Sequence, residues 1–227
     1  MNPWELEYQD PKLLTGQFAP QSFVLRALKV LKKQYGFRPS DKEMVDLGCG
    51  IGRNTIYLAE KGATISGFDI SRTAIRAAKS VARERGFGDM TLQVQDFNER
   101  ARIRAEDAAV DLTLCIMMFH LLNAAARPAL ASEIARATKP GGFLVLRTLA
   151  KEGDKNAKQL LQDFPTNEEG TYKMPGTGFH EHVFTKEELL NLFPGFSVVL
   201  CKKQTGYQTV GERRYARQYW ECILQRA

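Results

Sequence analysis

The fold of this chain is decided by the stretch Glu43-Met44-Val45-Asp46-Leu47-Gly48-Cys49-Gly50-Ile51-Gly52-Arg53-Asn54. A short apolar run, typical of a buried strand, ends in a glycine-rich turn, and a helical pattern follows at once. A strand, a glycine turn and a helix together present bare backbone N–H groups and a helix N-terminus to a ligand. The stretch therefore predicts a ligand site at the carboxyl end of a parallel strand.

A second feature is Asp69, which ends the next apolar run, Ala63–Phe68. It follows Gly52 at about the distance at which the second strand of such folds carries an acidic residue for ribose hydroxyls. Ser71 is a good N-cap for the helix that follows. We therefore expect Asp69 to face the same ligand as the glycine turn.

The segment Asp46–Gly52 resembles the first motif of the class I S-adenosylmethionine-dependent methyltransferases, an acidic residue followed by GxGxG. The resemblance continues in order to about residue 150: Asp69 matches the ribose position, Asp96-Phe97 the adenine position, Asp111 to Leu122 the fourth strand with its Phe119-His120 end, and Lys139 to Leu146 the turn into the fifth strand. Within this family, residues 50–55 and 184–189 look most like the tellurite-resistance-type small-molecule methyltransferases.

The resemblance implies an α/β, Rossmann-like class I methyltransferase fold. Its sheet would have seven mostly parallel strands, with a C-terminal antiparallel hairpin and an N-terminal helical cap. Strands that alternate with helices independently favour a parallel sheet with right-handed crossovers. We expect a single domain over residues 1–227, in which residues 1–39 form the cap and residues 151–183 a lid over the acceptor site.

The resemblance also makes S-adenosyl-L-methionine the cofactor and S-adenosyl-L-homocysteine the product. Glycine lets the backbone approach the methionine and ribose portions, and the three carboxylates would serve the cationic methionine end, the ribose and the adenine. The expected cofactor-binding residues are Asp46, Gly48, Gly50, Gly52, Asn54, Asp69, Ile70, Asp96, Phe97 and Ile116. Arg53 stands where a dinucleotide fingerprint wants its third glycine, which disfavours NAD.

Methyl transfer is an in-line displacement, so alignment of the acceptor and exclusion of water should supply most of the rate. His120 is the catalytic candidate, because an imidazole can relay a proton near neutral pH; the alternative is a structural role at the strand end. Further acceptor-pocket candidates are Tyr8, Phe119, Arg147 and His182. Trp4 and Phe18 either line this pocket or pack the cap, and Arg147 either orients an acidic acceptor or pairs with a carboxylate.

Three functions are compatible with these features. The first is methyl transfer to an oxygen, nitrogen, sulfur or metalloid centre of a small molecule. The second is an RNA (tRNA) methyltransferase, suggested by the net charge of +6 and a basic helix stripe at Arg72, Arg76, Lys79 and Arg83. That stripe is equally the polar side of an amphipathic helix, and the apolar 117–120 segment lacks a polar signature for a flipped base. The third is a non-catalytic cofactor-binding or interaction protein.

Composition adds four expectations. The four cysteines, Cys49, Cys115, Cys201 and Cys222, show no CxxC spacing and are expected to be structural thiols. His180, Glu181 and His182 offer too few ligands for zinc, so we expect no metal. No run is long and apolar enough to span a bilayer and no signal pattern is present, which indicates a cytoplasmic protein away from membranes. We expect a monomer or homodimer.

Overall fold

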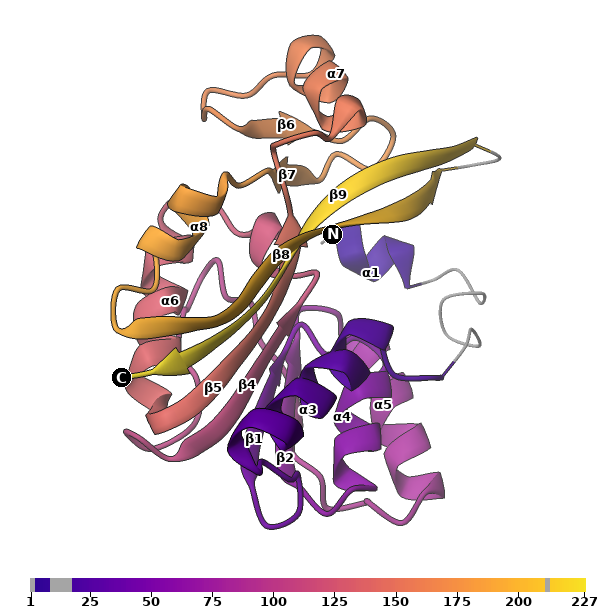
Figure 1. Cartoon of the computed structure of the whole chain (residues 1–227). Helices are drawn as coiled ribbons and strands as arrows, with labels where there is room; N and C mark the ends of the chain where they lie inside the picture. The colour runs from indigo at the N-terminus through magenta and orange to yellow at the C-terminus, as the bar shows by residue number, and fades with distance from the viewer. Residues whose placement is uncertain (1–2, 9–17, 211–212) are drawn as a thin grey trace.

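The computed structural model describes residues 3–8, 18–210 and 213–227 (Figure 1). In these ranges the helices are α1 (Pro3–Glu7), α3 (Ser22–Tyr35), α4 (Arg53–Ala59), α5 (Arg72–Glu84), the 3-10 turn η1 (Phe119–Leu121), α6 (Ala126–Ala137), α7 (Lys155–Asp163) and α8 (Lys186–Asn191). The strands are β1 (Glu43–Leu47), β2 (Thr64–Asp69), β3 (Leu92–Val94), β4 (Val110–Ile116), β5 (Thr138–Leu149), β6 (Thr171–Lys173), β7 (His180–His182), β8 (Phe196–Val210) and β9 (Arg213–Arg226).

A seven-stranded sheet in the order β3-β2-β1-β4-β5-β9-β8 forms the centre of the molecule. The pairs β2–β3, β1–β2, β1–β4 and β4–β5 are parallel, whereas β9 runs antiparallel to both β5 and β8. The predicted α/β fold, with its mostly parallel sheet and C-terminal antiparallel hairpin, is confirmed. Because β1 and β4 are adjacent but not consecutive, the chain reverses direction in the sheet order between them, and such a point opens a crevice at the strand ends.

Helices cover both faces of this sheet, and the central strand β4 explains why. Leu112 and Leu114 belong to one apolar cluster with Phe23 of α3, while Cys115 belongs to another with Leu130 of α6. Alternate side chains of a strand point to opposite faces, so β4 needs apolar cover on both sides. Figure 1 shows α3, α4 and α5 on one face and α6 on the other.

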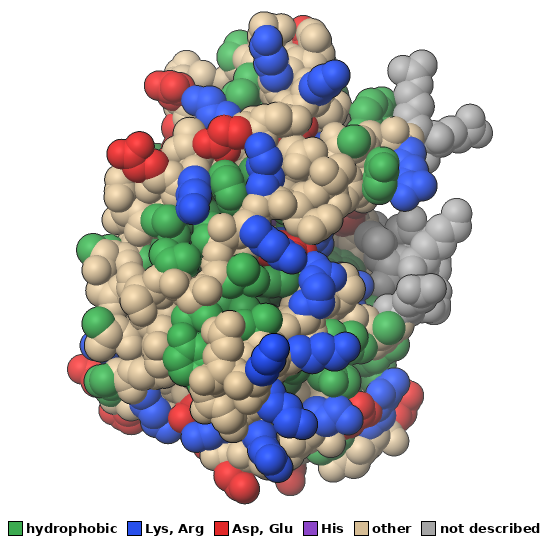
Figure 2. Space-filling view, in the orientation of Figure 1, with side chains coloured by type: hydrophobic (Ala, Val, Ile, Leu, Met, Phe, Trp, Pro, Cys, Tyr) green, Lys and Arg blue, Asp and Glu red, His purple; other side chains and the backbone are tan. Residues whose placement is uncertain are grey.

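The outer side of α3 is basic. Arg26, Lys29, Lys32 and Lys33 are exposed there, while the opposite side of the helix is buried against the sheet. Figure 2 shows Lys and Arg side chains gathered over this helix. This arrangement is that of an amphipathic helix with a solvated polar face.

The short helix α1 is held at the N-terminus of α5. The carboxylate of Glu5 accepts hydrogen bonds from the Ser71 hydroxyl at 2.9 Å, from the Thr73 backbone N–H at 3.4 Å and from the Thr73 hydroxyl. Ser71 is the N-cap of α5 and accepts the Ala74 N–H at 3.1 Å, as its sequence position predicts. A carboxylate is favoured at a helix N-terminus, where unpaired N–H groups point outward.

Residues 151–183 are more regular than their sequence suggests. They form α7 and the small antiparallel sheet β6–β7, in addition to connecting loops. A buried arginine attaches this segment to the hairpin: Arg217 Nε donates to Asp154 Oδ2 at 2.8 Å and Arg217 Nη2 to the Tyr172 hydroxyl at 2.6 Å. Asp154 also caps α7 through the Ala157 N–H. One buried cation therefore joins three elements that are distant in sequence.

Two sequence-based expectations about the C-terminal hairpin are wrong. The sequence favours strands only over residues 196–201 and 219–224, with residues 206–217 as their link. In the structure β8 instead continues to Val210 and β9 begins at Arg213, with Gly206 paired to Arg217. This two-stranded arm extends past the sheet (Figure 1), so its side chains need no apolar alternation. Cys201 and Cys222 are not separate thiols either, because the strand register places them opposite each other and they form a disulfide. Cys49 and Cys115 are free and buried, as expected.

Across the described ranges, every helix is too short or too polar to cross a bilayer.

Candidate functional site

A cavity of about 400 Å³ opens at the carboxyl ends of β1, β2, β3 and β4. The residues singled out from the sequence that line it are Trp4, Tyr8, Gly48, Gly50, Asn54, Asp69, Ile70, Asp96, Phe97 and Ile116. One part of the cavity wall, called the α1 end, consists of Trp4, Tyr8, Gln21 and Arg53. The predicted crevice is therefore present, and most of the expected cofactor residues share it.

The glycine turn brings bare backbone to the cavity. Gly48 and Gly50 have φ angles of 74° and 55°, which side-chain-bearing residues rarely adopt. A Cβ at Gly48 would lie 2.6 Å from Met118 Cβ, and one at Gly50 would lie 2.7 Å from the Tyr8 hydroxyl oxygen. Gly52 has no place in the cavity wall; at φ 83° it is the N-cap residue of α4. The turn leaves room for a ligand only while these positions remain glycine.

Asp69 lies in the cavity wall with both carboxylate oxygens engaged by backbone. Oδ2 accepts the Gly50 N–H at 2.8 Å and Oδ1 accepts the Ser71 N–H at 2.9 Å. Burial raises the pKa of this carboxyl, although the two backbone hydrogen bonds act in the opposite direction. A carboxylate oxygen can accept more than one hydrogen bond, so each can still receive a hydroxyl group.

Asp46 lies beneath the glycine turn and is 1% exposed. Its Oδ2 accepts the Thr55 hydroxyl at 2.6 Å, while Oδ1 has no hydrogen-bond partner among the described residues. Burial raises the pKa of Asp46 to about 6. Asp46 is not one of the cavity-wall residues, so the structure does not place this predicted cofactor residue in direct reach of a ligand. A buried carboxylate with a free acceptor costs free energy, and the charge of a cationic ligand group in the cavity would offset part of that cost.

The part of the cavity around Phe97 is lined mainly by apolar side chains. Phe97 lines it and packs edge-on against Phe68, with 6.4 Å between ring centroids. Ile70 and Leu122 add apolar surface, and Asp96, whose Oδ1 accepts the Asn98 N–H at 2.8 Å, supplies a carboxylate. An apolar slot with one acceptor at its edge suits a purine that carries an amino group.

Asn54 has a second task besides lining the cavity. Its Oδ1 accepts the Gln21 backbone N–H at 2.9 Å, which ties the start of α3 to the start of α4. Phe18, by contrast, is not one of the described wall residues; it packs beside Cys49 and Ile75, with the Arg85 guanidinium 5.0 Å from its ring. For Phe18 the structure therefore supports packing of the cap.

The structure does not bring His120 or Phe119 to the described cavity walls. Met117, with φ 62°, and Met118 face the cleft, and η1 then turns the next two side chains inward. Phe119 is fully buried against Phe184 and Phe193. Burial, helped by the charge of Arg217, lowers the pKa of His120 to about 3, so the ring is neutral. A proton relay by His120 would need direct reach to the acceptor, which this position does not provide.

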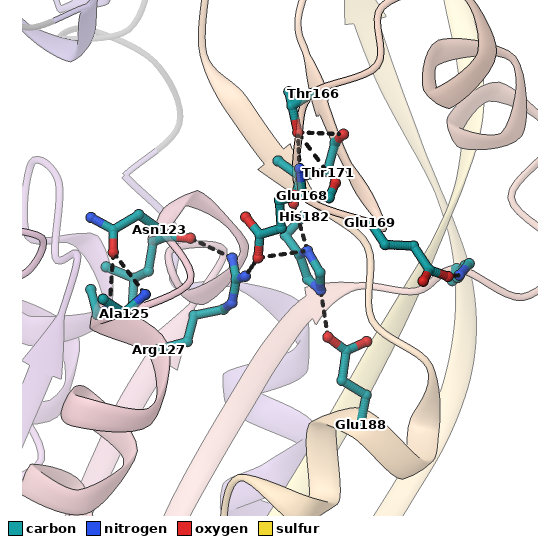
Figure 3. A network of polar contacts seen from close by, with 12 residues as sticks. Asn123, Ala125, Arg127, Thr166, Glu168, Glu169, Thr171, His182 and Glu188 are labelled. Carbon is teal, nitrogen blue, oxygen red and sulfur yellow. Dashed lines mark hydrogen bonds and ion pairs between the residues drawn. The ribbon is translucent and has the colours of Figure 1, made fainter.

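His182 is held in a polar network away from the cavity (Figure 3). Its Nδ1 lies 2.7 Å from the Thr171 hydroxyl and its Nε2 lies 2.6 Å from Glu188 Oε1. Glu168 forms an ion pair with Arg127 of α6 and lies 3.8 Å from the His182 ring. Glu188 also belongs to the capping box with Thr185 that the sequence predicts. The network links residues 151–183 to α6 and α8.

Arg147 lies on β5 beside the cavity without being part of its described wall. Its guanidinium lies 4.1 Å above the Tyr219 ring, and its Nε is 3.7 Å from Glu221 Oε1. Both oxygens of Glu221 already accept hydrogen bonds from Arg26, at 2.7 and 2.8 Å. Arg147 can therefore either orient an acidic acceptor or pair with the carboxylate of Glu221.

Arg53 is the charged residue of the described cavity wall that the sequence did not predict. It was noted only as a departure from a dinucleotide fingerprint, yet it lines the α1 end of the cavity. The sequence does carry a signal for it. A cation in the first turn of a helix is unfavourable beside the positive end of the helix dipole, so an arginine at this position indicates some other role. The basic stripe of α5 lies elsewhere, with Arg72, Arg76, Lys79 and Arg83 all exposed.

Comparison with known proteins agrees with this geometry. A family model described as a methyltransferase domain matches residues 44–142. A 2-heptyl-1-hydroxyquinolin-4(1H)-one methyltransferase of Mycobacteroides abscessus is 28% identical over 174 residues, which cover 77% of this chain and 70% of that protein. A ubiquinone biosynthesis O-methyltransferase of Paracidovorax citrulli is 30% identical over 121 residues, or 53% of this chain and 47% of that protein.

Solved structures show the same fold. TehB from Haemophilus influenzae has a TM-score of 0.70 at 18% identity, covering 94% of this chain and 64% of that chain. The magnesium protoporphyrin IX methyltransferase of Synechocystis PCC 6803 with bound SAH has a TM-score of 0.64 at 19% identity, covering 98% and 95%. At such identities the likeness concerns the fold.

Residues 44–142 of the chain match a methyltransferase domain, and the sheet has the fold of solved S-adenosylmethionine-dependent methyltransferases. The glycine turn and Asp69 lie within the matched residues. The cofactor of the chain is S-adenosyl-L-methionine. The cavity fits this group, because Gly48 and Gly50 leave the space that a Cβ would fill and Asp69 presents its carboxylate in the wall.

Proposed function

We propose that this enzyme methylates an oxygen, nitrogen, sulfur or metalloid centre of a small molecule by in-line displacement. The observation that carries the proposal is the cavity of about 400 Å³, whose α1 end is lined by the side chains of Trp4, Tyr8, Gln21 and Arg53. Cavities of this size are typical of small-molecule sites. The hydroxyquinolone and ubiquinone-pathway methyltransferases among the relatives are consistent with such an acceptor.

The chain's own residues would hold the cofactor in three places. Asp69 would accept the ribose hydroxyls, the glycine turn would contact the methionine portion, and the slot around Phe97 and Asp96 would take the adenine. When bound, the cofactor supplies an electrophilic methyl group on a sulfonium. The task left to the protein is to orient an acceptor lone pair toward that methyl group and to exclude water.

Among the described wall residues, the α1 end of the cavity offers no general base. Burial raises the pKa of the Tyr8 hydroxyl, and the negative charge of Asp69 acts in the same direction. Tyr8 therefore stays protonated and can donate a hydrogen bond to an acceptor atom. We infer that the acceptor arrives with a reactive lone pair and that the enzyme works mainly by positioning.

Calorimetry with S-adenosylhomocysteine tests the cofactor part of this proposal. Asp69→Asn places an amide against two backbone N–H donors, so we expect its affinity to fall by about tenfold or more. The matched control is Asp89→Asn, because Asp89 is exposed and distant from the cavity wall. Absence of binding to the wild-type protein would contradict the proposal.

The acceptor class is tested by transfer from isotope-labelled cofactor to a panel of phenols, thiols, amines and tellurite, with bulk tRNA in parallel. We expect label in the small-molecule fractions. Label confined to tRNA would replace the proposal with the RNA alternative.

A further inference from the structure

The α1 end of the cavity carries two aromatic rings. Trp4 and Tyr8 both line it and lie one helical turn apart, and the Tyr8 backbone N–H donates to the Trp4 carbonyl at 3.0 Å. Their ring centroids are 6.3 Å apart, with an angle of 40° between the ring planes. Glu5, between them in sequence, is hydrogen-bonded to Ser71 and Thr73 at the start of α5. The two rings therefore have a defined place in the wall.

Phe179 supports Trp4 without being part of the described wall. It lies in the turn between β6 and β7, and its ring centroid is 4.5 Å from that of Trp4, at an interplanar angle of 33°. The Phe179 carbonyl accepts the Met174 N–H at 2.6 Å. Its side chain packs against an apolar cluster that includes Tyr172 and Met174. A wall residue of the N-terminal segment is therefore held by a turn that is distant in sequence.

Met117 connects the same apolar cluster to the cavity. Its side chain lines the wall and also packs against the cluster that includes Tyr172 and Met174. Residues 151–183 thus lie behind two wall side chains, those of Trp4 and Met117. Aromatic rings and a methionine sulfur both make favourable contacts with a further aromatic ring. Such a wall suits a flat apolar ligand.

The polar groups at the α1 end restrict which hydroxyl can react there. Its described wall residues include no carboxylate or imidazole that could remove a proton. An aromatic hydroxyl ionises at about pH 10, as in tyrosine, whereas an aliphatic hydroxyl keeps its proton in that range. The positive charge of Arg53 in the wall favours an ionised oxygen, and the protonated Tyr8 hydroxyl can donate to it. An aromatic hydroxyl is therefore the better nucleophile at this end.

We propose that the α1 end binds a planar aromatic hydroxy compound as the methyl acceptor, with its ring packed on Trp4 and with Phe179 as the positioning residue for Trp4. This inference rests on the proposed function and names its acceptor class. The hydroxyl group gives its proton to water, and an oxygen lone pair then forms the new bond to the methyl carbon. The bond between sulfur and that carbon breaks, and its electron pair stays on sulfur.

Two probes with the same carbon skeleton test the inference. 1-Naphthol and decahydro-1-naphthol both carry a hydroxyl group, but only 1-naphthol is flat and readily ionised. Each is titrated by calorimetry into protein saturated with S-adenosylhomocysteine. The variants are Trp4→Leu, Trp4→Phe, Phe179→Leu and Phe179→Tyr. The control is Phe164→Leu, because Phe164 is an exposed aromatic residue of the same segment and is not part of the described wall.

We expect the wild type to bind 1-naphthol about five- to tenfold more tightly than the saturated analogue. Trp4→Leu should remove this preference and Phe179→Leu should reduce it, because each takes away a ring of the stack. Trp4→Phe and Phe179→Tyr should keep most of it, and Phe164→Leu should leave it unchanged. A loss of folded protein would affect both probes equally, so it would not change their ratio.

Methyl transfer from isotope-labelled cofactor is measured with the same two compounds. We expect label on 1-naphthol and none on the saturated analogue. The inference is overturned if the wild type binds both probes equally, if the preference survives Trp4→Leu, or if bound 1-naphthol receives no label. An unchanged preference in Phe179→Leu would refute the positioning role of Phe179. Failure of the wild type to bind S-adenosylhomocysteine, or label confined to tRNA, would instead contradict the proposed function.

Discussion

The two ends of the cavity are built in different ways. The end that we propose receives the adenosyl group consists of a backbone turn and carboxylates at the tips of β1, β2 and β3, all within about fifty residues of one another. The α1 end collects side chains from α1, the start of α3 and the start of α4. The first end is rigid because it belongs to the sheet, whereas the second depends on segments that fold over it. The difference suggests where a change of acceptor can occur without loss of the cofactor site.

The largest expected effect is a loss of stability at the ion pair that attaches residues 151–183 to the β8–β9 hairpin. Asp154→Ala removes the partner of the fully buried Arg217 and the cap of α7, so we expect the free energy of unfolding to fall by about 3–5 kcal/mol. Denaturant titration measures it, and Asp163→Ala, an exposed acid on the same helix, is the control. If the comparison is right, the folded variant still binds 5′-methylthioadenosine; equal losses in both variants would show that the buried ion pair is not special.

The glycine turn should be the most sensitive point of the adenosyl end. We expect Gly48→Ala to weaken S-adenosylhomocysteine binding by about tenfold or more. The added Cβ would collide with Met118, and alanine is strained at the left-handed φ of 74°. Gly176→Ala is the matched control, since Gly176 has φ 83° but open space around it. Calorimetry that finds the same affinity in both variants would contradict the assignment of the turn.

The negative charge of Asp46 should lower the stability of the protein and raise its affinity for the cofactor, and both effects should depend on pH. Its pKa in the folded protein, about 6, lies above the unfolded value of 3.8, so its contribution to stability is present below pH 3.8 and lost as pH rises through 6. We therefore expect Asp46→Asn to stabilise the protein by about 1–3 kcal/mol at pH 8 and hardly at all at pH 3.5. Thermal unfolding across this pH range measures the effect; a variant that is less stable than the wild type at pH 8 would refute it.

The same titration predicts the affinity for the cofactor. Protonation of Asp46 removes a negative charge from beneath the turn, so wild-type affinity for S-adenosylhomocysteine should decline as pH falls below 6. The affinity of Asp46→Asn should change less over that interval, and parallel curves for the two proteins would exclude Asp46 as the titrating group.

The smallest effect is expected on the outer face of the adenosyl end. Arg76→Ala changes an exposed residue of the basic stripe, so stability and cofactor affinity should stay within about 0.5 kcal/mol of the wild type. A large loss of affinity in calorimetry would mean that α5 does more than cover the sheet.

Sequence reasoning succeeded where spacing along the chain encodes geometry. Asp46, Gly48, Gly50 and Asp69 occupy strand ends and turns whose relation is set by one βαβ unit, so their convergence follows from the pattern. His120 could not be placed in the same way. A positive φ at Met117 decides which side chains after β4 face the cavity, and no residue preference announces that angle.

Contacts between segments that are distant in sequence could not be predicted either. Arg217 and Asp154 are separated by 63 positions, and the polar arm of β8 and β9 carries no apolar alternation to mark its strands.

The most direct test of the central claim is a structure of the protein with S-adenosylhomocysteine bound. We predict the ribose hydroxyls within hydrogen-bond distance of Asp69 and the amino-acid portion over Gly48 and Gly50, toward the α1 end. A ligand bound elsewhere, or a ribose that does not contact Asp69, would contradict the account.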